Sequence, residues 1–313
     1  MHTRRIETAT LVFWVAFSFI MVASDSAHPQ WVPPRGEGSF SVEYQNFNST
    51  DHIWSDLAHA RGYPNAAEHD DTEVSGNIIV MSLDYAVYDR LALNVTLPFI
   101  NTELKAGDIY AEGSGSSHRV DLEPNNAFQD LGVSLRYMAL TDPLFVTTSI
   151  GLTWPTHDYG THGHSAIGRN LRTFSVGAGV ARMLDPILSG VYLQGNYSYQ
   201  FSEKVRDINL NRSNVSAGIT YFPPIHSLSI SAYWNQQIAH GGIDWSDLFF
   251  PTNDQFAIHD QVAAESFGQI GGVISYSLTH RLGIYAGAFK IVDSVSKNTQ
   301  QSQGINIGTT TNF

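Results

Sequence analysis

Gly304-Ile-Asn-Ile-Gly-Thr-Thr-Thr-Asn-Phe313 closes the chain, and this stretch decides the fold. Every second side chain from Ile305 to Phe313 is apolar or a threonine, and those in between are glycine, threonine or asparagine. Successive side chains of a strand point to opposite faces, so the alternation predicts a strand with one apolar face. The chain then stops on an aromatic residue.

A half-apolar strand ending on phenylalanine is typical of the closing strand of a bacterial outer-membrane barrel, where a terminal aromatic residue is a common assembly signal. A soluble β-sandwich can also end on such a strand. If the barrel interpretation holds, we expect Phe313 to be recognised by the barrel assembly machinery. The rest of the chain decides between the two folds.

The composition fits a β-rich protein whose charges lie in loops. The net charge is −12, only 15% of residues are charged, 12% are aromatic, and there are 26 glycines and no cysteine. The lack of cysteine excludes disulfides, thiol catalysis and thiolate metal sites, and the acidic balance argues against nucleic acid as a partner.

The first 24 residues have the features of a signal peptide. Arg4 and Arg5 precede an apolar run from Leu11 to Val22, and small residues follow at 23–24. The run is short for a membrane span, so we expect cleavage rather than an anchor. Residues 25–313 then form one domain, because no linker or change in composition divides them.

Period-two alternation recurs along the rest of the chain and predicts twelve strands. The clearest hairpin has Ile79, Met81, Leu83 and Tyr85 on one face, and Val80, Ser82, Asp84 and Ala86 on the other. The predicted strands lie near 39–47, 79–86, 91–99, 130–137, 144–154, 174–180, 191–201, 215–221, 228–234, 270–278, 282–291 and 304–313. The face of the eleventh strand that turns outward cannot be assigned, since both of its faces are fairly apolar.

The connections between these strands are alternately long and short. Long connections are expected at 48–73, 100–127, 155–170, 236–263 and near 293–303, with a shorter one after Phe201. An even strand number with alternating loop lengths is the pattern of outer-membrane barrels. We therefore predict an all-β protein, a transmembrane antiparallel up-and-down barrel of about 12 strands. The lead-in around Trp31, Pro33 and Pro34 could plug the lumen or hang free in the periplasm, and we expect a free tail.

Several motifs resemble a known family. These are Leu83-Asp-Tyr-Ala-Val-Tyr-Asp-Arg-Leu-Ala-Leu-Asn-Val-Thr-Leu-Pro-Phe99, Phe128-Gln-Asp-Leu-Gly-Val-Ser-Leu-Arg-Tyr137, Trp154-Pro-Thr-His-Asp-Tyr159 and Tyr197-Ser-Tyr-Gln-Phe201. They are similar to outer-membrane barrels grouped with the MetA-pathway phenol-degradation proteins. The resemblance implies a channel or transporter, often associated with uptake of aromatic or other apolar compounds. No catalytic residue can be carried over from it.

Two sets of residues are candidates for contact with a solute. Polar residues predicted to face inward suit a wet lumen, although they could also bond one another and block it; they are Asp84, Asn94, Asp130, Arg136, Gln194, Asn196, Ser198 and Gln200. The loop at 236–263 is unusually apolar, which fits either a capture surface for an apolar solute or a lid folded over the mouth. Its candidates are Trp245, Phe249, Phe250 and Phe256.

Histidines are frequent in the predicted extracellular loops. His157, His162, His164 and His240, with nearby carboxylates, could bind a divalent metal, but their spacing matches no standard zinc motif. Histidines without metal are the simpler interpretation, and we expect no cofactor.

The sequence therefore predicts an outer-membrane channel in contact with lipid, through which small solutes, including aromatic or apolar ones, diffuse passively. Two alternatives stay open. One is a structural, adhesive or metal-binding barrel that acts through its loops. The other is a lipid-modifying hydrolase, for which His164-Ser165 and Ser117-His118 are adjacent Ser and His residues. No nucleophile-elbow motif supports that second alternative, and we expect no enzyme.

Overall fold

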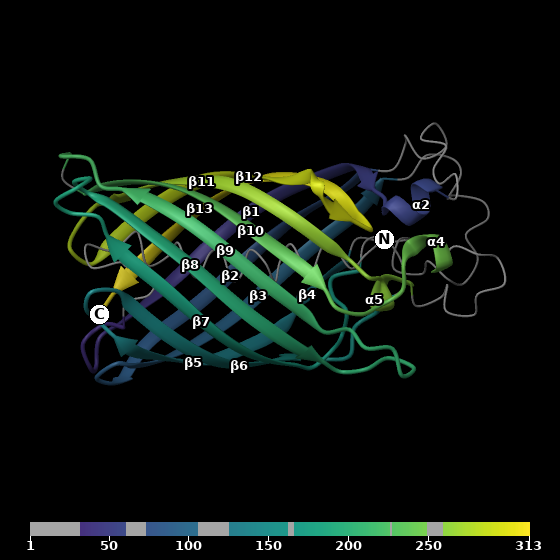
Figure 1. Cartoon of the computed structure of the whole chain (residues 1–313), viewed down its shortest axis with the longest axis horizontal. Helices are drawn as coiled ribbons and strands as arrows, with labels where there is room; N and C mark the ends of the chain where they lie inside the picture. Colours follow the sequence, from purple (N-terminus) through teal and green to yellow (C-terminus); the bar gives the residue numbers. More distant parts are fainter. Residues whose placement is uncertain (1–31, 61–72, 106–124, 162–165, 226, 249–258) are drawn as a thin grey trace.

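The protein forms a closed β-barrel with its long connections gathered at one end (Figure 1). The computed structural model describes residues 32–60, 73–105, 125–161, 166–225, 227–248 and 259–313. The predicted signal peptide therefore lies outside the described residues. No helix in these ranges is long and apolar enough to cross a membrane.

All neighbouring strands are antiparallel, and each pairs with its neighbours along the chain. The strands are β1 (Gly38–Ile53), β2 (Glu73–Tyr88), β3 (Leu91–Lys105), β4 (Asn125–Phe128), β5 (Asp130–Leu140), β6 (Phe145–Pro155), β7 (Thr173–Met183), β8 (Val191–Ser202), β9 (Arg212–Tyr221), β10 (Leu228–Ala239), β11 (Ser266–Ser277), β12 (Leu282–Lys297) and β13 (Thr299–Asn312). Short helices α2 (Asp56–Ala60), α4 (Trp245–Leu248) and α5 (His259–Val262) lie among the long connections. The ring closes because β1 pairs with both β2 and β13.

β4 and β5 are one strand of the wall, interrupted by a bulge at Gln129. Both pair with β3, and the register shifts by one residue between the Phe99–Phe128 and Thr96–Gly132 pairs. Pro98 lies between these two pairs on β3 and has no N–H to donate, so the ladder is broken there. With β4 and β5 counted as one strand, the described chain forms twelve, which confirms the predicted barrel.

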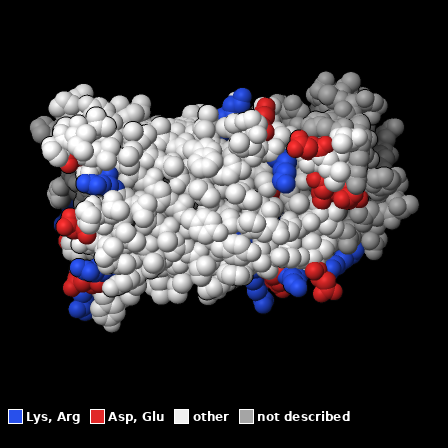
Figure 2. Space-filling view, viewed as in Figure 1, with Lys and Arg blue, Asp and Glu red and all other residues white. Residues whose placement is uncertain are grey.

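The alternation also divides the two faces as predicted. On β2, Ile79 and Tyr85 point outward and are 39% and 36% exposed, whereas Val80, Asp84 and Ala86 point inward and are at most 4% exposed. β12 is now assigned, with Ile284 outward and Tyr285 and Phe289 inward. Figure 2 shows the result, a nearly uncharged middle band between two charged ends. Such a band is the lipid-facing surface of a transmembrane barrel.

Two expectations about the connections were wrong. The loop predicted near 293–303 is absent, because β12 runs to Lys297 and β13 starts at Thr299, with only Asn298 between them. Asn298 has a φ of 50°, a left-handed conformation that asparagine tolerates well. Residues 293–303 are polar on both faces because β12 and β13 continue past the apolar band. In the sequence, such a polar stretch looks like a loop.

The lead-in from Val32 onward is not a free tail either, whereas Trp31 lies outside the described residues. Val32 is only 2% exposed and packs against the inward-facing Ala86, Ala92 and Met138. The Ala86 N–H donates to the Glu37 carbonyl, and the Gly36 N–H donates to the Ala86 carbonyl, both at 2.9 Å. The apolar side chain of Val32 thus lies in the mouth of the barrel at the short-turn end. Short turns mark the periplasmic end of such barrels, so Val32 lies at the periplasmic mouth.

Candidate functional site

The lumen is the candidate site, and all eight polar candidates lie on its wall. Six of them are 9% exposed or less, whereas Asp130 and Asn196 are half-buried. Asp84, Asn94 and Arg136 come together on β2, β3 and β5, near the periplasmic end. The other four inward candidates on the far wall, Gln194, Asn196, Ser198 and Gln200, follow one another along β8.

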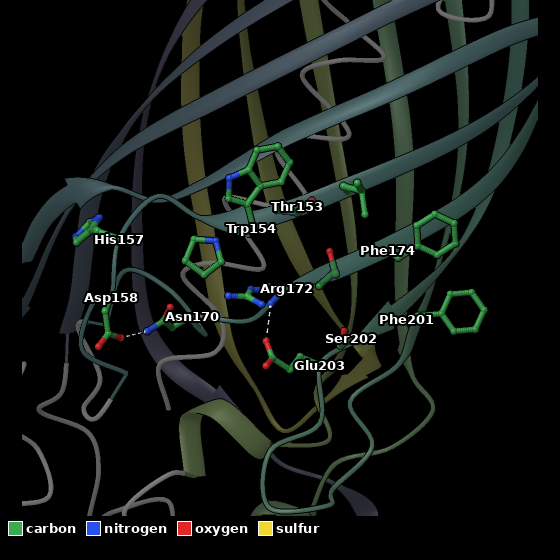
Figure 3. Close-up of a pocket in the computed structure, with 13 residues that line it drawn as sticks. Thr153, Trp154, His157, Asp158, Asn170, Arg172, Phe174, Phe201, Ser202 and Glu203 are labelled. Carbon is green, nitrogen blue, oxygen red and sulfur yellow. Dashed lines mark hydrogen bonds between the residues drawn. The ribbon is translucent and has the colours of Figure 1, made fainter.

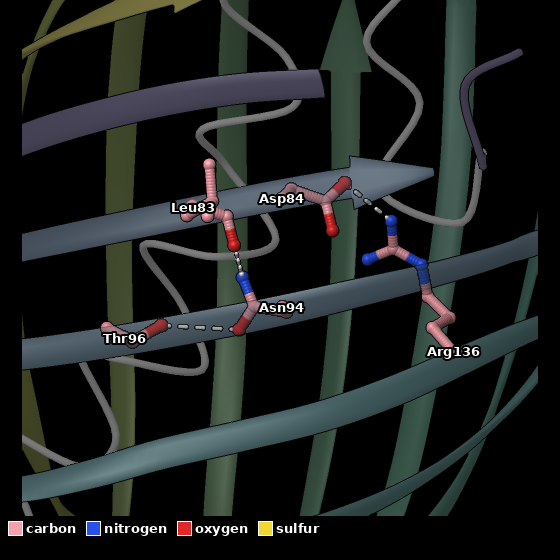
Figure 4. Close-up of polar contacts among 5 residues, drawn as sticks. All are labelled: Leu83, Asp84, Asn94, Thr96 and Arg136. Carbon is pink, nitrogen blue, oxygen red and sulfur yellow. Dashed lines mark hydrogen bonds and ion pairs between the residues drawn. The ribbon is translucent and has the colours of Figure 1, made fainter. Parts of the chain in front are cut away.

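Asp84 and Arg136 form a buried ion pair (Figure 4). The Arg136 Nη2 lies 3.0 Å from Asp84 Oδ2. Both side chains are buried, with 7% of Arg136 and 6% of Asp84 exposed. Asn94 lies opposite Asp84, donates to the Leu83 carbonyl at 3.0 Å and accepts from Thr96 Oγ1 at 3.2 Å. The two charges neutralise each other, so this part of the wall is polar without a net charge.

The sequence reasoning missed a further inward carboxyl, Glu43 on β1. It is 1% exposed and accepts hydrogen bonds from Gln45 and, at 3.1 Å, from Asn306 Nδ2. The alternation in residues 39–47 placed Glu43 opposite the apolar face. That signal would have been sufficient to include it with the polar lumen candidates.

A large apolar cluster lines one side of the lumen, which the sequence reasoning did not anticipate. Inward side chains from β1, β2, β3, β10, β11 and β12 form one cluster with two residues of the β6–β7 connection; the cluster is Phe47, Val74, Ile78, Val80, Ile100, Tyr159, Ile167, Tyr233, Phe267, Val273, Tyr285, Phe289 and Ile291. The two apolar faces of β12 follow from this arrangement, because one face meets lipid and the other meets this cluster.

Within the cluster, aromatic residues and glycines alternate along one row across the wall. The register pairs Gly76 with Phe47, Phe47 with Gly304, Gly304 with Phe289, Phe289 with Gly271, and Gly271 with Tyr233. We call Phe47, Phe289 and Tyr233 with these three glycines the aromatic–glycine belt. It extends over β2, β1, β13, β12, β11 and β10.

The rings of the belt lie flat against the wall. A Cβ atom placed on Gly304 would be 2.7 Å from the Phe289 ring, and one on Gly271 would be 2.3 Å from the Tyr233 ring. Each ring thus covers the neighbouring glycine, where any side chain would clash with it. The belt therefore covers this part of the wall with aromatic rings and makes it apolar.

The β6–β7 connection enters the lumen and is anchored there by Tyr159. This side chain is 8% exposed; its hydroxyl donates to Asp130 and accepts the Asn170 N–H at 3.1 Å. Burial and the neighbouring Asp130 raise the pKa of Tyr159 well above its usual value, so the hydroxyl keeps its proton. Ile167, 3% exposed, carries the same connection into the apolar cluster.

Arg169 ties this connection to the one between β10 and β11. Its guanidinium donates to the Gln261 and Ala263 carbonyls, and the Gln261 side-chain amide donates back to the Arg169 carbonyl at 2.8 Å. A small apolar cluster of Leu171, Leu210, Val262 and Ala263 packs beside it. The described parts of these connections therefore form one packed cap at the extracellular mouth.

The apolar capture loop and the metal site remain predictions. Phe249, Phe250 and Phe256 lie outside the described residues, as do His162 and His164, and the structure describes the backbone but not the side chain of Trp245. His157 contacts Thr156 and Tyr159, whereas His240 contacts Ser213 and Tyr199. Within the described ranges, no three His, Asp or Glu side chains are grouped as a metal site.

The structure brings together a Ser–His pair that the sequence reasoning missed. Ser213 Oγ lies 2.6 Å from His240 Nε2 and 3.0 Å from the Tyr197 hydroxyl, on the outer wall. A serine nucleophile needs an open approach for a carbonyl carbon, yet Ser213 is only 3% exposed. The pair therefore fits a polar contact in the aromatic girdle better than a catalytic dyad. The pairs Ser117-His118 and His164-Ser165 lie outside the described residues.

Comparison with known proteins agrees with this architecture. A family model described as "Putative MetA-pathway of phenol degradation" matches residues 72–308. No protein of curated function matches the sequence. The COG4313 outer membrane channel from Pseudomonas putida F1 is similar over 90% of this chain and 97% of its own, with a TM-score of 0.64 at 14% identity. That match shows a shared outer-membrane barrel fold.

Two more distant solved structures are also channels or transporters. The CymD monoaromatic hydrocarbon channel has a TM-score of 0.46 at 11% identity, covering 95% of this chain and 92% of its own. The Pseudomonas putida toluene transporter TodX has a TM-score of 0.42 at 9% identity, covering 94% and 93%. Both are too distant to support a comparison of details.

Proposed function

The chain belongs to the family described as "Putative MetA-pathway of phenol degradation", and we propose that it is a passive outer-membrane channel for small apolar solutes, including aromatic ones. No bond is made or broken in this function. The solute enters at the extracellular mouth, passes the apolar cluster on the lumen wall and leaves into the periplasm past the polar residues near that end.

The aromatic–glycine belt is the observation that carries this proposal. A sugar or an ion passing an apolar wall gives up hydrogen bonds to water without replacing them, whereas an apolar solute loses only unfavourable contact with water. Phe47, Phe289 and Tyr233 supply this apolar surface; each ring is at most 9% exposed within the packed cluster, so a solute contacts it where that packing opens. The belt therefore favours apolar over polar solutes.

The polar residues of the wall near the periplasmic end support release rather than retention. The buried hydroxyls of Ser41 and Thr310, which lie opposite each other on β1 and β13, form no hydrogen bond with the described residues. Such atoms favour hydration of this part of the lumen. An apolar solute leaving the belt would meet a wet wall that binds it weakly.

Flux through liposomes containing the refolded protein tests the proposal. We expect phenol to enter faster than into protein-free liposomes after correction for passive leak, and a small sugar to enter much more slowly than phenol. Equal flux of the two solutes would contradict the role of the belt. Absence of protein-dependent flux for both would overturn the channel itself and favour a structural or adhesive barrel, with intact binding at its loops.

We further propose that the barrel is exported with residues 1–24 as a cleaved leader and assembled through its last strand. Phe313 is 53% exposed at the periplasmic rim, beside Tyr85 at a ring-centroid distance of 6.4 Å. An exposed terminal ring is available to an assembly factor before the strand pairs with β1. The outward aliphatic band would then contact outer-membrane lipid.

A further inference from the structure

A groove on the outside of the barrel has the features of a ligand site. It lies where β6, β7 and β8 meet the extracellular connections and has a volume of about 1080 Å³ (Figure 3). Its lower part is the outer wall, and its upper rim is polar. Clefts of this size, mainly apolar with a few polar groups, are typical of small-molecule sites.

Outward side chains from three strands form the apolar floor. Leu152 lies opposite Phe174, and Phe174 lies opposite Phe201, so the three form a row across β6, β7 and β8. The Phe174 and Phe201 rings are stacked with centroids 6.1 Å apart. Trp154 stands two residues further along β6, and all four side chains are between 37% and 54% exposed. Their open faces are available to a planar ligand.

The groove is open because the β6–β7 connection turns into the lumen. β6 ends at Pro155 and β7 begins at Thr173, while the connection between them places Tyr159 and Ile167 among the lumen residues. A connection of this length could otherwise cover the outer rim. The fold leaves the aromatic row uncovered at the level where the barrel leaves the membrane.

Charge decides which class of molecule fits. The rim contains one cation, Arg172, and two carboxylates, Asp158 and Glu203, and the Arg172 N–H donates to Glu203 Oε2 at 3.4 Å. The net charge of the rim is therefore negative, which disfavours the anionic phosphorylated headgroups of outer-leaflet lipids. A neutral molecule with an aromatic body and one hydrogen-bonding group fits both parts of the groove.

The rim is bonded directly to the anchor of the inserted connection. Asn170 lines the groove, and its side-chain amide donates to Asp158 and, at 3.2 Å, to the Tyr159 carbonyl. The Asn170 N–H in turn donates to the Tyr159 hydroxyl. A ligand in the groove thus lies against a residue that holds the connection within the lumen.

We propose that this groove binds neutral small aromatic molecules from the extracellular membrane interface before they enter the lumen. The link to entry rests on the proposed channel function, whereas binding in the groove does not. Single-ring solutes fit easily, since an engineered cavity of about 150 Å³ already holds benzene. The groove concentrates the solute beside the mouth of the barrel.

Tryptophan fluorescence tests the proposal, because Trp154 lines the groove and Trp234 provides a matched control. Both are outward-facing and 37% exposed, but Trp234 lies on β10 outside the groove. Two variants of the full refolded chain would be made, one that keeps only Trp154 and one that keeps only Trp234, with Phe in place of every other tryptophan. Nitrobenzene, a neutral aromatic quencher, would then be titrated into each variant.

We expect saturable quenching of Trp154 and only linear, partition-driven quenching of Trp234. In the variant that keeps only Trp154, the further change Phe201→Ala should raise the half-saturating concentration of nitrobenzene about threefold to tenfold. This is the effect of losing one ring contact. Phe40→Ala on the outer face of β1 should leave that concentration unchanged. Linear quenching of equal slope at both tryptophans would overturn the proposal.

Two further outcomes separate this site from the channel and from lipid. Saturable binding without solute flux would support the groove as a binding site and contradict the channel function. Flux without saturable binding would support the channel and contradict the binding site. In liposomes of brominated phosphatidylcholine, nitrobenzene should reduce bromine quenching of Trp154 by displacing acyl chains. Strong bromine quenching that nitrobenzene leaves unchanged would identify the occupant as lipid and overturn the proposal.

Discussion

The side chains of Asp84 and Arg136 show how a charged pair is accommodated in the lumen. Their 3.0 Å ion pair is nearly inaccessible to solvent. Removing one partner of such a pair leaves an uncompensated charge, which costs about 3–5 kcal/mol, whereas removing both costs far less.

We therefore expect Asp84→Asn to destabilise the barrel strongly and the double variant Asp84→Asn, Arg136→Met to recover much of the loss. Reversible unfolding by urea in detergent gives the free energy of unfolding of both variants. If the single and double variants have the same free energy of unfolding, the two charges do not interact.

Tyr159 is the residue on which the inserted connection depends most directly. Tyr159→Phe keeps the ring in the apolar cluster but removes the bonds to Asp130 and Asn170. Each bond is worth about 0.5–3 kcal/mol, the upper part applying to a charged acceptor. The connection should leave the lumen more often, so single-channel recordings should show larger and noisier conductance.

The control for this experiment is Tyr137→Phe, which removes a hydroxyl from an outward-facing tyrosine of β5. Its conductance should match that of the unchanged protein. Unaltered conductance in Tyr159→Phe as well would show that the Tyr159 hydroxyl does not hold the connection.

At the scale of the element, β13 closes the barrel. The Gly38 N–H donates to the Phe313 carbonyl, and the Phe313 N–H donates to the Gly38 carbonyl, both at 2.9 Å. The Phe313 ring lies over Gly38 and beside Tyr85. Phe313→Ala keeps the backbone bonds but removes the ring.

We expect Phe313→Ala to lower the proportion of folded barrel in detergent, and to lower the amount assembled in cells still further. The comparison is Ile307→Ala, which removes an outward side chain from the same strand away from its end. Similar losses in the two variants would mean that the terminal ring has no special role.

Elements also show where the sequence was a sufficient guide. The faces of β2 and β3 could be predicted residue by residue, because period-two alternation requires only local information. The turn at Asn298 could not, because the segment around it is polar on both faces. The direction of Val32 could not be predicted either, since it depends on Ala86 and Met138, which are distant in the sequence.

For the whole molecule, we expect the apolar belt to decide which solutes pass. We expect Phe47→Ser with Phe289→Ser to raise sugar flux and to reduce the ratio of phenol flux to sugar flux, because two rings of the wall become small and polar. Flux through liposomes measures the ratio. Phe40→Ser, on the outer face of β1, serves as the control for folding and insertion.

An unchanged ratio in the double variant would place solute discrimination elsewhere, for example at the packed cap over the mouth. A large rise in the flux of both solutes would show that the rings restrict the width of the lumen rather than its polarity.

The sequence by itself determined the strands, their number, the apolar outer band and the facing of every strand except the eleventh, because each follows from alternation within about ten residues. It also identified the polar lumen residues Asp84, Asn94 and Arg136, since these stand opposite aliphatic neighbours on their own strands. Only the tertiary structure decided which apolar residues line one side of the lumen. Phe47 and Phe289 are separated by most of the chain and meet Gly304 only through the register of β1, β12 and β13. The inward turn of Ile167 and the groove outside it follow from the same packing, which no local pattern records.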